Sequence, residues 1–212
     1  MTKPYADTAA PIAVPPERID ETVAVLCDAF HDYPVMTHIV GEAGSDYDRR
    51  LRTLIHFFVS NRVLRAEPIL GIEDGGRLVA IATLTPPGER PVPEPIEGMR
   101  AALWEALGAD AKARHEALFQ AWMRYTHPGL HYHLNMLGVR RSHAGRGLGS
   151  RLLTAIHARS LDDAESSGVT LSTEDPKNVP LYQHCGYEIT AHERVTDRLE
   201  TWQFFRPNDT AR

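Results

Sequence analysis

Three glycines at alternate positions, Gly145, Gly147 and Gly149, are the residues of this chain whose spacing most clearly implies chemistry. Glycine has no Cβ, so the backbone of such a stretch can approach a ligand closely. The basic residues around them are Arg140, Arg141, His143, Arg146 and Arg151. A helical pattern begins near Leu148, so the glycines lie at a helix N-terminus, where free N–H groups and the helix dipole favour an anion. This combination predicts a loop that binds a phosphate-bearing ligand.

One possible ligand of this loop is a dinucleotide, which would make the chain a nicotinamide-dependent oxidoreductase. The spacing Gly145-x-Gly147-x-x-Ser150 approaches the dinucleotide fingerprint. That fingerprint ends in Gly or Ala and follows its strand almost directly. Here Ser150 takes the last place, and the basic stretch 140–144 separates the loop from the strand before it. The pattern therefore favours another phosphate-bearing ligand.

The segment before the loop, 131–139, predicts a half-buried strand, because β-forming residues alternate there with polar ones. His131, His133 and Asn135 fall on one face of such a strand. An imidazole titrates near neutral pH, so His133 is a candidate proton acceptor. The two histidines could also ligate a metal ion, but the sequence indicates no third ligand, and we expect no metal site. A packed or exposed strand histidine is the alternative reading of His133.

A second group of chemically informative residues follows a predicted strand at 169–173. Asn178 and Tyr182 lie one helical turn apart in a short predicted helix, which stops at Gly186 before Tyr187. An Asn at that place caps the helix or binds a ligand. The phenol of Tyr182 carries a proton at neutral pH and can donate it, or its ring can pack the short helix onto the sheet.

The glycine loop and the later motif, in this order, resemble two motifs of the GNAT N-acetyltransferase family. The family's coenzyme A loop has Gln or Arg, two residues, Gly, one residue, and Gly or Ala. In this chain that pattern falls on Ala144, Gly147 and Gly149, so the leading Gln or Arg is missing. The family's later sequence of Asn, Tyr and Gly-Phe falls on Asn178, Tyr182 and Gly186-Tyr187. The resemblance implies transfer of an acetyl group from acetyl-CoA to an amine by direct attack in a ternary complex.

A looser likeness, to the puromycin N-acetyltransferases of this family, covers most of the chain. It comprises the early segment 29–34, a helical insertion before the central strand, and the late segment 178–182. Ser172 stands where those enzymes have a glutamate on the fifth strand. The likeness therefore implies acetyl transfer without implying the antibiotic as the acceptor. A small-molecule amine is the expected substrate, and a peptide amine is the alternative.

The family resemblance also implies where acetyl-CoA binds. The coenzyme would lie between the strands 131–139 and 169–173 where they splay, and Gly138 would form a bulge that lets them part. Backbone groups of Leu137 and Val139 would bind the pantetheine arm, and one of their N–H groups could stabilise an oxyanion. The remaining coenzyme-binding residues would be Gly145, Arg146, Gly147, Leu148, Gly149, Ser150, Asn178 and Tyr182. Arg140 or Arg141 could reach other phosphates or lie solvated at the surface.

Two proton transfers are needed if an amine attacks a thioester. The amine must lose a proton first, and the resemblance assigns this role to His133, with Glu174 as the second choice. Loss of His133 would then flatten the rise of activity with pH and lower the rate about 10²–10⁴-fold. The departing thiolate can take a proton from Tyr182, which matches the family tyrosine near the coenzyme sulfur. A catalytically silent acyl-CoA sensor with the same residues is the alternative to an enzyme.

The fold that the resemblance implies is a GNAT acyl-CoA N-acyltransferase fold of the α/β class, with a central, mixed and partly parallel sheet. We expect a single domain over 1–212, with a polar flexible tail at 1–10 and a coenzyme-binding half at 131–206. A proline-rich connector and two apolar helical stripes predict a helical insertion at 86–130. The strand–helix–strand pattern at 131–173 predicts a parallel crossover.

The other elements are predicted from local patterns. Pro11 to Val14 suits an edge strand, and an apolar face from Ile19 to Phe30 predicts a helix that starts near Pro16 and ends at Pro34. Ser45 and Asp48 suggest a capped helix start. The remaining predictions are a hairpin of 69–72 and 78–85 around Asp74-Gly75-Gly76 and a final antiparallel pair at 187–195 and 200–205.

Composition excludes several classes of protein. The formal net charge of -5 over 212 residues argues against a general nucleic-acid binder. Two cysteines, Cys27 and Cys185, imply no disulfide framework. Nothing in the first residues resembles a signal peptide, and no stretch is long and apolar enough to span a bilayer. We therefore expect a cytoplasmic protein, either a monomer or a homodimer, that binds neither nucleic acid nor membrane.

Overall fold

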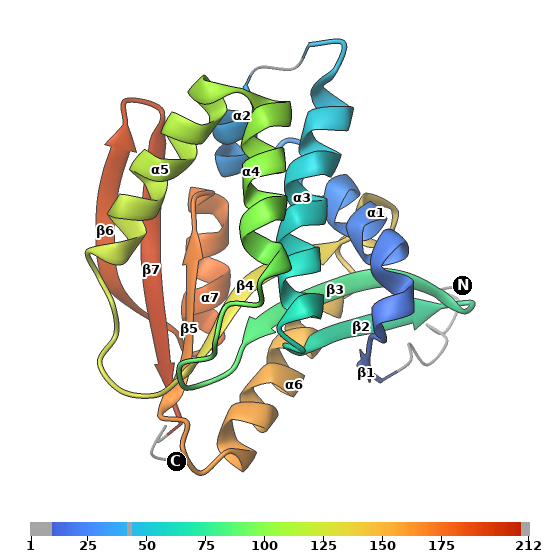
Figure 1. The fold of residues 1–212 in the computed structure, drawn as a ribbon. Coiled ribbons are helices and arrows are strands. Elements are labelled where there is room, and N and C mark those ends of the chain that lie inside the picture. Colours follow the sequence, from blue (N-terminus) through green and yellow to red (C-terminus); the bar gives the residue numbers. More distant parts are fainter. Residues whose placement is uncertain (1–9, 42–43, 209–212) are drawn as a thin grey trace.

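A seven-stranded sheet runs through the described part of the protein, and helices cover both of its faces (Figure 1). The computed structural model describes residues 10–41 and 44–208, so the predicted tail 1–10 lies outside the described residues except for Ala10. The strands are β1 (Ile12–Ala13), β2 (Ile69–Asp74), β3 (Arg77–Thr85), β4 (Tyr132–Val139), β5 (Gly168–Thr173), β6 (Glu188–Thr196) and β7 (Leu199–Pro207). Their order across the sheet is β1-β2-β3-β4-β5-β7-β6.

The helices divide between the two faces of the sheet. They are α1 (Ile19–Phe30), α2 (Pro34–Val40), α3 (Tyr47–Leu64), α4 (Pro95–Leu107), α5 (Ala109–Met123), α6 (Leu148–Asp162) and α7 (Val179–His184), with short 3-10 turns at Pro16–Arg18, Arg141–His143 and Pro176–Asn178. Helices α1 to α5 pack on one face, whereas α6 and α7 pack on the other (Figure 1). No helix within the described ranges is both long and apolar enough to cross a membrane.

The sheet is mixed, as the sequence predicts. Strands β4 and β5 are parallel, and α6 makes the crossover between them, whereas every other neighbouring pair is antiparallel. The hairpin of β2 and β3 and the final pair of β6 and β7 are confirmed. Two helices, α4 and α5, occupy the predicted insertion.

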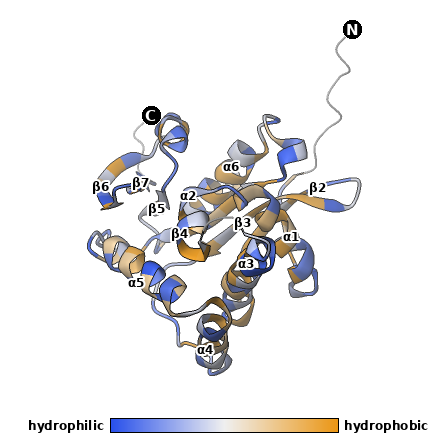
Figure 2. Cartoon of the chain, turned by 90° about the horizontal axis from the view of Figure 1, so that it is seen from above, coloured by the Kyte–Doolittle hydropathy of each residue, from blue (hydrophilic) through white to orange (hydrophobic). Residues whose placement is uncertain are grey.

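Two hydrophobic cores lie on opposite sides of the sheet. The first joins α1 to α5 through residues such as Leu26, Leu54 and Met136. The second joins α6 and α7 to the strands through residues such as Leu152 and Phe204. Hydrophobic residues accordingly gather on the central strands in Figure 2. Burial on both faces fixes which side chains of β4 can face each helical layer.

Two local predictions near the N-terminus were wrong. The helix that was expected to end at Pro34 ends at Phe30, and Pro34 instead begins α2, where a backbone N–H would have no helical partner. Helix α3 begins at Tyr47, so Asp48 lies inside it. Its N-cap residue is Asp46 rather than Ser45, and no side chain caps it.

Gly138 is required by the packing of α1 rather than by a bulge. It pairs regularly with Ile81 of β3, and a Cβ at this position would lie 2.8 Å from Ala29 Cβ and 3.0 Å from Leu26 Cδ2. The register of β4 shifts instead at Asn135, so the predicted bulge at Gly138 was wrong. The absence of a side chain at Gly138 lets α1 lie directly on the strand.

Gly138→Ala is expected to destabilise the protein by about 1–3 kcal/mol, because the new methyl group overpacks the contact with Ala29. Gly98→Ala is the matched control, since a Cβ there meets nothing within 4 Å and lies in the exposed part of α4. That control should be neutral or slightly stabilising, as for Gly to Ala changes in helices. Chemical denaturation of both variants measures the difference; equal stabilities would contradict the packing argument.

Candidate active site

The two parallel strands separate at the centre of the sheet. Pairing between β4 and β5 joins Tyr132 to Val169 and Leu134 to Leu171, and no pair follows, although β4 continues to Val139 and β5 to Thr173. The predicted splay is therefore present. Along the second half of β4, backbone groups that face β5 have no strand partner there, so they are available to an extended ligand.

A bulge at Asn135 marks the point where the strands part. Thr83 of β3 lies opposite Met136, whereas the next residue, Leu84, lies opposite Leu134, so Asn135 is the extra residue. Its amide compensates for the interrupted ladder, because Nδ2 donates to the carbonyl oxygen of His133 at 3.0 Å. The side chain of Asn135 therefore satisfies a backbone carbonyl next to the bulge.

A buried ion pair fixes the orientation of the Asn135 amide. Arg62 Nη1 donates to Asn135 Oδ1 at 3.1 Å and lies 2.6 Å from Glu67 Oε2. Both charged side chains come from the end of α3 and the segment after it, and both are largely shielded from solvent. Thr85 Oγ1 also bonds Arg62 and accepts from Asn135 Nδ2. The polar face of β4 at this point is therefore tied to α3.

The glycine loop adopts a conformation that favours glycine. Gly145 and Gly147 have φ values of 74° and 73°, the left-handed region, and α6 begins directly afterwards at Leu148. A Cβ at either glycine would meet no atom within 4 Å, so the space beside the loop is open. Backbone hydrogen bonds of the loop end with Ala144 and resume at Arg151, which donates to the Gly147 carbonyl. The N–H groups between them can bind an anion.

The basic residues next to the loop already hold it in place. Arg140 Nε donates to the Leu78 carbonyl oxygen at 3.0 Å, and Arg141 Nη2 lies 2.9 Å from Asp32 Oδ2. His143 Nε2 lies 3.1 Å from Asp74 Oδ2. Arg140 and Arg141 were expected to reach phosphates or to lie solvated; in this structure they bind protein groups. An anion at this loop would therefore meet mainly backbone N–H groups.

Tyr182 lies on α7 against the sheet. Only 8% of the residue is exposed, and its ring packs edge-to-face on Tyr187, with centroids 5.8 Å apart. Burial, followed by the charge of Glu174, raises the pKa of the Tyr182 phenol, so it is protonated at neutral pH. Asn178, one turn earlier, does not cap α7; its Nδ2 donates to Thr173 Oγ1 at 3.2 Å. Both positions agree with a site at the end of β5.

Glu174 directly follows β5 and is the most deeply enclosed acid of this region, with 5% of the residue exposed. Trp122 Nε1 and Thr201 Oγ1 donate to its Oε1 at 3.1 and 2.9 Å. The Tyr33 hydroxyl lies 3.4 Å from Oε2. Burial raises the pKa of this carboxyl to about 7, although the hydrogen bonds oppose the rise. Such a group changes charge near neutral pH.

His133 lies on β4 and is half-buried. Its Nδ1 makes a hydrogen bond of 2.9 Å with Thr170 Oγ1 on β5. Burial, with the nearby His131 and Arg62, lowers the pKa of His133 to about 4. The expectation that this imidazole titrates near neutral pH was therefore wrong. No group of three His, Cys, Asp or Glu residues able to hold a metal occurs among the described residues.

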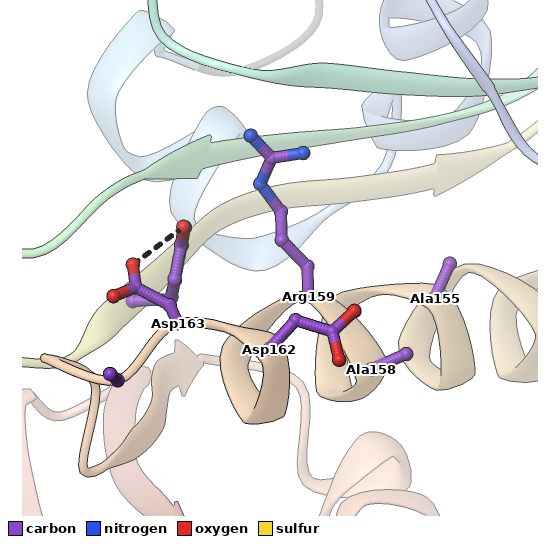
Figure 3. A pocket seen from close by; sticks show the side chains of 7 residues that line it. Ala155, Ala158, Arg159, Asp162 and Asp163 are labelled. Carbon is purple, nitrogen blue, oxygen red and sulfur yellow. Dashed lines mark hydrogen bonds between the residues drawn. The ribbon is translucent and has the colours of Figure 1, made fainter.

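A surface hollow at the other end of α6 lies away from these groups (Figure 3). It is lined by Tyr132, Ala155, Ala158, Arg159, Asp162, Asp163 and Ala164. The Tyr132 hydroxyl donates to Asp163 Oδ2 at 3.0 Å, shown by the dashed line. Helix α6 begins at Leu148 and the lining of the hollow begins at Ala155, so the hollow starts about 10 Å along the helix from the glycine loop, at 1.5 Å per residue.

Comparison with known sequences identifies one family. Residues 66–189, more than half of the chain, match the family model described as an acetyltransferase (GNAT) domain. The matched segment contains the bulge, the glycine loop, Glu174 and Tyr182. It does not contain Tyr33 or Thr201.

Solved structures of several acetyltransferases share this fold. A protein described as histone acetyltransferase HPA2 and related acetyltransferase, from Corynebacterium glutamicum, has a TM-score of 0.72 at 18% identity, covering 97% of this chain and 100% of that one. The Drosophila melanogaster polyamine N-acetyltransferase has a TM-score of 0.60 at 20% identity, covering 92% and 98%. The Escherichia coli ribosomal-protein-S18-alanine N-acetyltransferase has 0.53 at 13% identity, covering 96% of both chains.

Proposed function

The chain belongs to the GNAT acetyltransferase family, and from this premise we propose that it transfers the acetyl group of acetyl-CoA to the amine of a small molecule. The observation that supports the proposal best is the arrangement of the open glycine loop, the splayed strands and Tyr182 around the ends of β4 and β5. The mixed sheet, with its single parallel pair, also differs from the parallel sheet that binds dinucleotides.

The residues of the site fit acetyl-CoA. N–H groups of Gly145, Arg146, Gly147, Leu148, Gly149 and Ser150 would hold the pyrophosphate at the start of α6. Backbone groups of Leu137, Gly138 and Val139 would hold the pantetheine arm, because this part of β4 has no partner on the β5 side. When bound, the coenzyme supplies the acetyl group as a thioester. One free β4 N–H would stabilise the negative charge that develops on the acetyl oxygen.

Tyr182 is proposed as the general acid. Its phenol is protonated at neutral pH, and it lies at the end of β5 on the side of the sheet that α6 covers. From there its Oη would deliver a proton to the departing sulfur. Asn178 would then position the neighbouring end of β5 through Thr173, besides any direct contact with the coenzyme.

The acceptor would bind near the α1–α2 junction, the end of α5 and β7, which meet at Glu174. Trp122 at the end of α5 contacts Glu174 directly, so the helical insertion closes over this side. An acceptor side that is enclosed by several elements would favour a small-molecule amine over a folded protein. Two of the similar structures have names that include a polyamine and a ribosomal protein as substrates, so both kinds of acceptor occur on this fold.

A panel of amines with acetyl-CoA, read by release of the coenzyme thiol, tests the proposal. Turnover of at least one small amine, with the acetylated product identified by mass, is the expected result. Tight acetyl-CoA binding without turnover of small amines or peptides would instead indicate a silent acyl-CoA sensor. Stabilisation by NAD but not by coenzyme A would support the oxidoreductase alternative.

His133→Ala is expected to change the rate between pH 6 and 8 by less than about tenfold, because a base with a low pKa has little driving force for proton transfer. A base must be deprotonated, so a pKa of about 4 would place any His133-dependent rise in activity near pH 4 and leave the profile level above it. A loss of 10²–10⁴-fold near pH 7, the usual worth of a positioned base, would restore His133 to that role. The pH profile of kcat/KM of the variant decides between the two outcomes.

A further inference from the structure

Glu174 lies where four separate elements of the acceptor side meet. It follows β5 and contacts Tyr33 between α1 and α2, Trp122 at the end of α5, and Thr201 on β7. Ser172 of β5 is a fourth neutral hydrogen-bond partner, and no basic side chain pairs with this carboxylate in the described part of the chain. A buried carboxylate without a cationic partner is costly, so its retention calls for an explanation.

We propose that the Glu174 carboxylate is the base that takes the proton from the acceptor's ammonium group. This inference rests on the proposed acetyl transfer and goes beyond it, because it names the residue that activates the amine and implies an acceptor that arrives as a cation. A cationic amine supplies the positive partner that the carboxylate lacks in this structure.

The two oxygens of Glu174 differ in how firmly they are held. Oε1 accepts from Trp122 and Thr201 at 3.1 and 2.9 Å, which are ordinary hydrogen-bond lengths. Oε2 faces the Tyr33 hydroxyl at 3.4 Å, a long contact. Two donors at ordinary distances thus hold Oε1, so Oε2 is the oxygen that we assign to the contact with the amine. Because the Tyr33 hydroxyl contacts this oxygen and its residue is only half-buried, the amine would approach beside Tyr33.

Hydrogen bonds at the end of β5 link Glu174, the proposed base, to the short helix that carries Tyr182, the proposed acid. The Tyr33 hydroxyl bonds both the Glu174 N–H, at 3.0 Å, and Thr173 Oγ1, at 2.8 Å. Thr173 in turn accepts from Asn178, one turn before Tyr182. The charge of Glu174 is also one of the causes that raise the pKa of Tyr182. The carboxylate and the phenol therefore flank the end of β5.

The elements packed around Glu174 each contribute charged or titratable groups, and none of these groups forms an ion pair with it. Tyr33 and Tyr182 are both neutral at pH 7, because burial raises the pKa of each. Glu193 of β6 lies opposite Thr201 and is paired with Arg124, after the end of α5. With burial as the main influence, the pKa of Glu174 is about 7, which suits a base that must accept and release a proton near neutrality.

The proton transfer balances without any further reactant. One N–H bond of the ammonium breaks, its electron pair stays on nitrogen, and Glu174 Oε2 gains the proton. The neutral amine can then attack, and the protonated carboxyl returns its proton to solvent afterwards. Compared with His133, whose pKa is about 4, Glu174 can hold that proton at neutral pH.

Glu174→Gln tests the inference, because the amide keeps the size of the side chain and can still accept from Trp122 and Thr201. We expect kcat/KM near pH 8 to fall about 10²–10⁴-fold, and the rise of activity through pH 7 to disappear. Acetyl-CoA affinity and the thermal midpoint should remain near those of the wild type. A Glu174→Gln variant with the wild-type rate and pH profile would overturn the proposal while leaving acetyl transfer intact.

Thr201→Val is the matched second variant, since it removes one donor to Oε1 and keeps the carboxylate and the packing. The Thr201 hydrogen bond lowers the pKa of Glu174, so its loss should move the pH inflection upward. An infrared titration of the carboxyl band, wild type minus Glu174→Gln without coenzyme, measures the same pKa independently of turnover. A band already ionised at pH 5, or an unmoved inflection in Thr201→Val, would contradict the assignment. Inactivity of the wild type on every amine would instead refute the proposed function.

Discussion

Gly147→Val is expected to raise the dissociation constant of acetyl-CoA on the order of 100-fold. The loop would present N–H groups to the pyrophosphate, and a branched side chain would occupy the open space beside Gly147. Loss of two hydrogen bonds to a charged group costs about 3 kcal/mol or more, and each 1.4 kcal/mol is a factor of ten. Isothermal titration calorimetry of the folded variant measures the effect.

Backbone strain is the competing explanation for that loss, because Gly147 has a φ of 73° that valine rarely adopts. Gly108→Val provides the matched control: Gly108 has a φ of 85°, and a Cβ there also meets nothing within 4 Å. It lies between α4 and α5, away from the loop. Both variants should lose similar stability, but only Gly147→Val should lose coenzyme affinity. Unchanged affinity in Gly147→Val would remove the coenzyme from this loop.

Tyr182→Phe is expected to lower kcat about tenfold or more while folding and coenzyme binding stay nearly normal. The change removes one hydroxyl and keeps the ring that packs against Tyr187 and Phe204. Residual activity should remain, because a thiolate leaves fairly well without a proton. Single-turnover rates with a preferred amine isolate the chemical step.

Tyr187→Phe is the control for the loss of a phenol from the same aromatic cluster. Its hydroxyl makes a hydrogen bond of 3.0 Å with Nε2 of His157 on α6, and it does not bond Glu174. This variant should change stability without changing the chemical step. If the two variants behaved alike, with stability lowered and kcat kept, the role of Tyr182 would be packing.

Local sequence signals were sufficient to locate the elements of the proposed coenzyme site. Alternating glycines fix their own turn and mark the start of α6, and the hairpin at Asp74 to Gly76 follows from turn chemistry. Asn178 and Tyr182 are four residues apart on one helix face. Each of these features depends on residues close in sequence, so the pattern alone locates them. Their proposed roles at the site remain predictions.

The acceptor half depends on contacts that no local pattern reveals. Tyr33 and Glu174 are 141 positions apart, and Trp122 and Glu174 are 52 apart. The sequence offered Glu174 only as a second choice, because its pKa follows from burial by these distant partners. The bulge at Asn135 likewise depends on pairing with β3, which sequence periodicity cannot specify.

Two errors did have a signal in the sequence. Pro34 is followed by Val35, Met36, Ile39 and Val40, an apolar helical spacing that identifies a new helix rather than an end. Arg141 follows a strand that packs on α1, and the acids Asp28 and Asp32 lie near the end of that helix. Its charge therefore serves the fold, whereas the basic cluster alone suggested a ligand.

The partners of Glu174 limit how far its segment of the chain can function after transfer into another family member. Two of these partners, Tyr33 and Thr201, lie outside residues 66–189, which carry the family match. A chimera that exchanged only this segment with another family member would transplant the glycine loop and Tyr182 together. It would leave the carboxylate facing residues that were selected for a different acid. If the proposed roles hold, the segment 66–189 carries coenzyme binding as a unit, whereas activation of the acceptor also depends on residues near the two ends of the chain.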